Sequence, residues 1–179
     1  MPKYVAFLRA INVGGHTVKM DQLRKLFEAI GFTNVETFIA SGNVIFDSKT
    51  KSAVALERKI ESHLEKALGY KVATFLRTTA ELASIANYVP FAKSELEAEG
   101  NDLFVAFGAQ VASAEGKRRL MELRTKAHDF HCNDREVYWL RRRLMEGAEY
   151  SGPALEKSVG MPITVRNSTT VRKIVAKYS

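Results

Sequence analysis

The chain has 179 residues, one cysteine and a formal net charge of +7. A single cysteine excludes an internal disulfide and suits a reducing compartment. No apolar run approaches the ~18 residues of a membrane span, and the first ten residues read as a strand instead of a signal peptide. The composition therefore predicts a cytoplasmic globular protein without a membrane partner, and it points to no particular cofactor.

Apolar spacing predicts alternating strands and helices in the N-terminal half. The predicted strands cover residues 3–10, 35–40, 44–47 and 72–76. The predicted helices cover residues 20–30, 54–68 and 78–88. Gly31 and Gly69 are typical residues for helix ends, and Thr78-x-x-Glu81 forms a capping box. We interpret Ser41-Gly42-Asn43 as a hairpin turn, because Gly and Asn accept positive φ at little cost.

An acidic stretch over residues 93–101 reads as a connector, after which the order of elements repeats. The predicted strands of this half cover residues 103–107, 130–132, 137–140 and 163–166. The predicted helices cover residues 114–127, the first capped by Ser113, then 154–159 and 170–177.

The repeated order β-α-β-β-α-β predicts an internal duplication. We expect an α+β protein of two ferredoxin-like halves, each with a mixed or antiparallel sheet, helices packed on one face and a trailing helix. The expected halves cover residues 1–91 and 92–179. Residue identity between the halves is poor, so the repeat is one of element order.

Two glycine-bearing segments form the candidate site. A right-handed crossover makes the first two strands parallel, with the third antiparallel between them, so both segments should lie at one edge of the sheet. Glycines let a ligand approach the backbone, and a helix start favours an anion. We therefore expect a small anionic ligand. The predicted ligand-binding residues are Arg9, Asn12, Gly14, Gly15, Lys19, Ser41, Gly42 and Asn43, with Arg166 and Asn167 added for their position between a strand and a helix.

Other interpretations of the same residues stay open. In one alternative the glycines do no more than let the chain turn, since neither a dinucleotide fingerprint nor a P-loop is present. Residues 117–179 carry 14 basic and 7 acidic side chains, including the runs 117–119 and 141–143, which could bind nucleic acid or another polyanion. Such runs more often form a solvated surface. An enzyme whose acid and base meet only in three dimensions is the third alternative.

Other familiar chemistry is hard to find in the sequence. His131 and Cys132 are neighbours on a predicted strand, so they point to opposite faces and cannot act as a base and a nucleophile together. His128, His131 and Cys132 lack a second ligand pair at zinc spacing. Of Tyr138 and Trp139, we expect one in the core and consider the other as an exposed stacking platform.

Three blocks resemble one known family. They are L-R-A-I-N-V-G-G at Leu8–Gly15, K-M-D-Q-L-R-K-L-F at Lys19–Phe27 and T-F-I-A-S-G-N-V-I-F at Thr37–Phe46. Together with T-V-R-N at Thr164–Asn167, they resemble the domain of unknown function 1697 family. Ser168 departs from the pattern, which has an aromatic residue there. The resemblance implies an α+β, bacterial-type cytoplasmic protein without an assigned activity, so no catalytic residue carries over.

Overall fold

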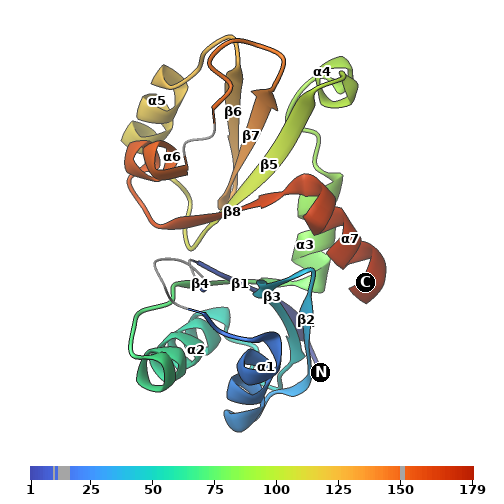
Figure 1. The fold of residues 1–179 in the computed structure, drawn as a ribbon, viewed down its shortest axis with the longest axis vertical. Helices are drawn as coiled ribbons and strands as arrows, with labels where there is room; N and C mark the ends of the chain where they lie inside the picture. The colour runs from blue at the N-terminus through green and yellow to red at the C-terminus, as the bar shows by residue number, and fades with distance from the viewer. Residues whose placement is uncertain (10, 12–16, 150–151) are drawn as a thin grey trace. The chain divides into compact units, whose positions relative to one another are not determined.

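The computed structural model describes residues 1–9, 11, 17–149 and 152–179, leaving aside the side chains of residues 40 and 41. The chain divides into two compact units. The first comprises Met1–Ile85 and Ile174–Ser179, and the second comprises Ala86–Lys173. Each unit is built on its own four-stranded antiparallel sheet (Figure 1).

The first unit has the strand order β2-β3-β1-β4. Its strands are β1 (Lys3–Leu8), β2 (Thr33–Phe38), β3 (Ala40–Asp47) and β4 (Thr74–Thr78). Its helices are α1 (Met20–Ala29) and α2 (Ala53–Leu68), followed by α3 (Thr79–Asn87), which continues past the end of the unit. Because β3 is antiparallel to both β1 and β2, those two strands are parallel to each other, as expected. Helices α1 and α2 lie along one face of the sheet (Figure 1).

The second unit repeats this topology with the order β6-β7-β5-β8. Its strands are β5 (Asn101–Gly108), β6 (His128–Asn133), β7 (Glu136–Arg142) and β8 (Ile163–Asn167). Its helices are α4 (Lys93–Glu97), α5 (Ala114–Glu122), α6 (Gly152–Val159) and the first part of α7 (Ser168–Tyr178). The predicted α+β fold with two β-α-β-β-α-β halves is confirmed.

The main core of the first unit lies between its sheet and its two helices. Aromatic side chains dominate it: Phe32 stacks on Phe46 at 4.3 Å between ring centroids, and Tyr4 and Phe27 contact Phe46 from other sides. Leu23 and Phe27 are the buried residues of α1, which confirms the three-to-four spacing read from the sequence. In α2 the buried residues are Leu56, Ile60 and Leu64, whereas Val54 in the first turn is 59% exposed.

The predicted capping signals at Thr78, Ser113 and Gly69 are confirmed. The Glu81 amide donates to Thr78 Oγ1 at 3.1 Å, and the Thr78 amide donates to Glu81 Oε2 at 2.8 Å, which completes the capping box at α3. Ser113 Oγ accepts from the Gly116 amide at 2.9 Å at the start of α5. Gly69 ends α2 with φ +85°, a conformation that glycine adopts without steric cost.

Two predicted boundaries are wrong. The acidic connector contains the one-turn helix α4, whose Glu95 binds Asn101 and Arg142, so tertiary contacts order a segment that the composition marks as a loop. Helix α5 ends at Glu122, and Ala127 lies in the following turn instead. The Ala127 amide there donates to Thr125 Oγ1, a local hydrogen bond that competes with helix.

The two sheets match residue by residue along their central strands. Val5-Ala6-Phe7 in β1 and Val105-Ala106-Phe107 in β5 occupy the same register positions. Arg77 pairs with Val5, and Arg166 pairs with Val105. Both arginines donate from Nη1 to the carbonyl oxygen of the preceding residue. These correspondences favour an internal duplication, although most other residues have diverged.

Candidate functional site

The predicted site is centred on one end of the first sheet. In the β1–β3 ladder Phe7 lies opposite Asn43, so the chain leaves β1 where β3 begins. Arg9 follows β1 directly, and its amide donates to the Ala73 carbonyl oxygen at 2.9 Å. The end of β1 and the start of β3 are therefore neighbours, which is the arrangement that the crossover rule predicts.

The hairpin turn lies elsewhere than expected, because Ser41, Gly42 and Asn43 belong to β3. Between β2 and β3 the register passes from Thr37 opposite Val44 to Phe38 opposite Ala40, so these three residues bulge from the β2 ladder. The chain reverses at Ile39, which has φ +67° and is 52% exposed. A β-branched residue in this region stores strain, which sequence patterns do not indicate.

The bulge is well anchored. Asn43 is 1% exposed, and its side-chain amide donates to the Phe38 carbonyl oxygen at 3.2 Å, which closes the loop around Ile39. Gly42 is also buried. Bulges of this kind bend a strand and redirect its side chains, and they recur beside active sites. Asn12, Gly14 and Gly15, the other half of the predicted site, lie outside the described residues.

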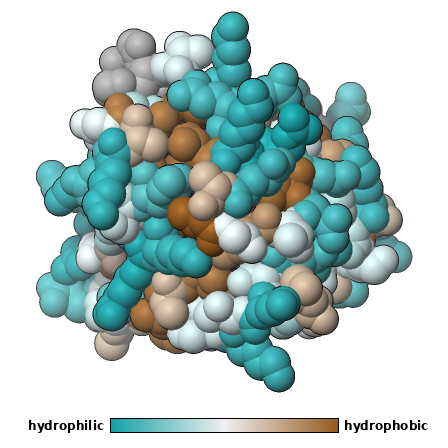
Figure 2. Space-filling view, turned by 90° about the horizontal axis from the view of Figure 1, so that it is seen from below, coloured by the Kyte–Doolittle hydropathy of each residue, from teal (hydrophilic) through white to brown (hydrophobic). Residues whose placement is uncertain are grey.

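Basic groups lie near the beginning of α1. Lys19 is the exposed N-cap residue, with an extended backbone and no side-chain hydrogen bond to the first turn. Asp21 lies in the same turn and opposes an anion there, with Arg24 at 3.8 Å from its carboxylate. Seen from the side of α1 and α2, hydrophilic side chains cover most of the surface, with small hydrophobic patches between them (Figure 2).

Arg166 and Asn167 belong to the second unit, where each has a structural contact. Arg166 donates to Thr164 Oγ1 at 2.8 Å and to the Val165 carbonyl oxygen at 3.0 Å. Asn167 Oδ1 accepts from the Thr169 amide at 2.8 Å at the start of α7. These contacts hold the junction between β8 and α7.

The two basic runs of the second unit are largely paired with carboxylates. Arg141 and Arg143 both contact Asp102, and Arg142 contacts Glu95. In α5, the side chains of Arg118 and Arg119 pair with acidic residues of the same helix. Such pairing lowers the positive potential that a polyanion would meet at these residues.

The histidines and the cysteine of β6 are held by other groups. His131 Nε2 lies 2.7 Å from the Tyr88 hydroxyl, whereas Cys132 packs on the helix side of the sheet, which confirms their opposite faces. Burial raises the pKa of the Cys132 thiol, while Lys117 acts in the opposite sense. Among the described residues, no three His, Cys, Asp or Glu side chains cluster as metal ligands would. Tyr138 and Trp139 are both buried, so the alternative that one of them forms an exposed stacking platform is wrong.

None of the helices in the described part of the chain combines the length and apolar character needed to cross a membrane.

Comparison with known proteins identifies a solved structure with a similar fold. The structure of the conserved bacterial protein SP0830 from Streptococcus pneumoniae is similar over 99% of this chain and 98% of that one, with a TM-score of 0.75 and 21% identity. No curated protein matches the sequence. The model of the family described as "Protein of unknown function (DUF1697)" matches residues 1–138, and its match includes the whole of the bulged β3 edge. The chain therefore belongs to the DUF1697 family.

Proposed function

We propose that the first unit binds a small anionic ligand at the edge formed by the end of β1, the β3 bulge and the start of α1. The observation that carries this proposal is the register of Phe7 opposite Asn43, which sets Arg9 and the bulge at one edge. The bulge and the strained Ile39 support it, because such irregular backbone persists where a function or the surrounding structure demands it.

Charge sets the kind of ligand. Arg9 and Lys19 flank the segment that contains the Gly14-Gly15 pair. The start of α1 adds the positive end of a helix dipole, and its N-cap residue offers no side-chain acceptor of its own. A compact phosphorylated or carboxylated metabolite fits these features better than a long polyanion, because the arginines of the run 141–143 in the second unit are already paired with acids.

A thermal-shift panel of phosphorylated and carboxylated metabolites tests the proposal. A ligand that binds only the folded state raises the melting temperature as its concentration rises. The expected result is at least one concentration-dependent hit. Its shift should fall strongly in Lys19→Ala and in Asn12→Ala, each of which alters one predicted contact.

The matched control is Lys25→Ala, which removes the same charge from an exposed position further along α1. It should keep the shift of the wild-type protein. If the ligand-induced shift in melting temperature fell equally in Lys19→Ala and Lys25→Ala, this would show a general charge effect and would contradict the site. A panel without any hit would argue against the ligand class.

A further inference from the structure

We propose that a cavity in the second unit binds a benzene-sized aromatic ring that carries a positively charged group. This site is separate from the edge discussed above and lies within the second unit alone. Its walls are mainly apolar. They come from the end of α5, from β6 and β7, and from the first turn of α6: Leu123, Phe130, Trp139, Ala154 and Leu155.

The size of the cavity sets the size of the ligand. Its volume is about 160 Å³. An apolar protein cavity of about 150 Å³ accepts benzene, so a single six-membered ring fits here and a fused polycyclic system does not. The cavity is partly open to solvent and its lining includes the exposed Glu149, so a ligand can enter without unfolding the core.

The cavity exists because a short helix covers this sheet. Helix α6 has 8 residues, while α2, its counterpart in the first unit, has 16. At 1.5 Å per residue these helices are about 12 Å and about 24 Å long, so α6 covers about half the length of strand surface. The space beside its first turn remains lined by Trp139 and Phe130 from the sheet.

The ring nitrogens of Trp139 and His128 in the wall are already hydrogen-bonded. Trp139 Nε1 donates to His128 Nδ1 at 3.0 Å, and His128 Nε2 lies 2.9 Å from the Gly147 carbonyl oxygen. Because an indole N–H can only donate, Nδ1 is the acceptor, and the imidazole proton on Nε2 is directed to Gly147. The wall therefore presents ring faces and aliphatic groups, which favours an apolar ring with little need for hydrogen bonds in the interior.

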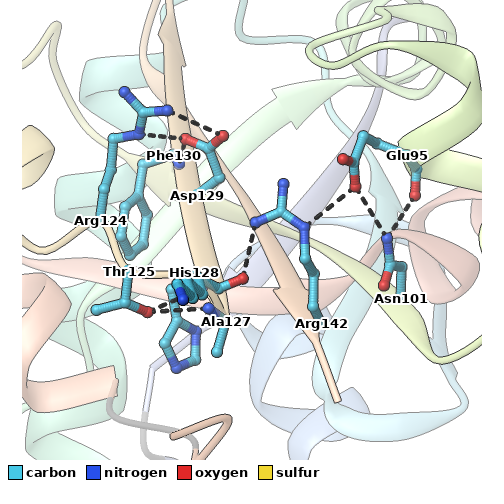
Figure 3. A network of polar contacts seen from close by, with 10 residues as sticks. Glu95, Asn101, Arg124, Thr125, Ala127, His128, Asp129, Phe130 and Arg142 are labelled. Carbon is cyan, nitrogen blue, oxygen red and sulfur yellow. Dashed lines mark hydrogen bonds and ion pairs between the residues drawn. The ribbon is translucent and has the colours of Figure 1, made fainter. Parts of the chain in front are cut away.

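A polar network holds His128 in place. Thr125 Oγ1 accepts from the amides of Ala127 and His128, both at 3.1 Å. Arg142 spans this turn and α4, since it donates to the Lys126 carbonyl oxygen and pairs with Glu95 (Figure 3). A wall fixed in this way is formed before the ligand arrives, which lowers the entropic cost of binding.

The charge of the ligand follows from Glu149. Among the described residues that line the cavity, Glu149 is the one with an acidic side chain, and it lies two residues after Gly147, whose carbonyl oxygen contacts His128. A ring seated between Trp139 and Leu155 would place a short cationic substituent near this carboxylate. An anionic substituent would be repelled there.

Tryptophan fluorescence tests the proposal, because Trp139 is the single tryptophan of the chain and lines the cavity. The probes are benzylamine, benzyl alcohol and benzoate, which share one ring and differ in charge. Saturable quenching is expected for benzylamine, with an affinity about threefold higher than for benzyl alcohol, as befits an exposed charge pair. Benzoate should bind most weakly. The preference for benzylamine should shrink at high salt.

Three variants sharpen the result. Ala154→Leu fills the cavity and should abolish saturable quenching by all three probes. The matched control Ala55→Leu makes the same change at an exposed position of α2 and should bind benzylamine like the wild type. Glu149→Gln should lower the affinity for benzylamine to the affinity for benzyl alcohol.

Absence of saturable quenching in the wild type would overturn the proposal, and so would quenching that persists in a folded Ala154→Leu protein. Equal affinities for benzylamine and benzoate would overturn the assignment of a cationic ligand. If circular dichroism shows that Ala154→Leu does not fold, the Glu149→Gln comparison decides the question. None of these outcomes depends on the anion site, which lies in the other unit.

Discussion

The two units place different cores on equivalent sheets. Phe46 of β3 and Trp139 of β7 occupy the same register position, opposite Tyr4 and Phe104 respectively. Around Phe46 the long helix α2 and the rings of Phe27 and Phe32 close the core. Around Trp139 the short helix α6 leaves a cavity. Strand order therefore does not decide how well a core is filled, because that depends on how much of the sheet the helices cover.

The units also differ in the polar groups that they bury. Asn43 in β3 corresponds to Glu136 in β7, and Phe75 in β4 corresponds to Thr164 in β8. Two residues further along the same face, however, both strands carry an arginine, which is Arg77 in β4 and Arg166 in β8. Both units keep this arginine although its neighbours differ. This indicates that its hydrogen bond to the backbone stabilises both sheets.

The largest expected effect comes from the two equivalent core aromatics. Phe46→Ala should lower the free energy of unfolding by about 4 kcal/mol, because it removes a ring from a closed core and leaves an empty space. Trp139→Ala should cost about 3 kcal/mol, since it enlarges a cavity that water can enter. Urea unfolding of both variants measures the difference. A larger loss for Trp139→Ala would contradict the idea that the second core is the looser one.

The two arginines give the next comparison. Arg77 is 1% exposed, so Arg77→Ala should cost about 3 kcal/mol by leaving buried acceptors without a charged donor. Arg166 is partly exposed, and water can replace its contacts, so Arg166→Ala should cost about 1 kcal/mol. Chemical denaturation of both variants tests this order, and equal costs would show that burial does not separate the two positions.

The close approach of α5 to α6 predicts an effect of intermediate size. A Cβ atom on Gly116 would lie 2.5 Å from the Val159 carbonyl oxygen, and a backbone atom cannot move aside cheaply. Gly116→Ala should therefore destabilise the protein by about 2 kcal/mol, although alanine is the better helix former by about 1 kcal/mol. Thermal unfolding of Gly116→Ala and of the wild-type protein measures this destabilisation. A rise in melting temperature would mean that the second unit adjusts to a methyl group more easily than its helix packing suggests.

The smallest effect concerns the end of β3. Asp47 pairs with Lys3 in the first sheet, whereas the equivalent positions of the second sheet hold the apolar pair Leu140 and Leu103. Burial alone would raise the pKa of Asp47, but Asn34 and Lys3 lower it on balance. The carboxylate therefore stabilises the fold at neutral pH, and this contribution disappears as the pH falls through the lowered pKa.

Asp47→Asn should accordingly lose about 1 kcal/mol at pH 7 and less at about pH 2, because acid progressively removes the charge from the wild-type carboxylate. Urea unfolding at the two pH values provides the measurement. Leu140→Ala serves as the comparison, because its cost should not change with pH. A loss in Asp47→Asn that is the same at both pH values would exclude the ion pair as its cause.

Much of the fold could be read from local patterns. The capping box at Thr78, the cap at Ser113 and the glycines that end helices act through neighbouring residues, so their meaning survives without tertiary information. The apolar spacing of α1 and the order of strands are likewise properties of short segments and of chain handedness. These features determined the fold class and which strand ends meet.

Only the tertiary structure decided where the chain reverses at Ile39, since a β-branched residue is disfavoured there and pairing with β1 draws Asn43 into the strand. The cavity beside Trp139 also follows only from the tertiary structure, because it depends on the length of α6 relative to the sheet beneath it. The physical reason is common to both. Local propensities are worth about 1 kcal/mol or less per residue, and the burial of a whole sheet face outweighs them.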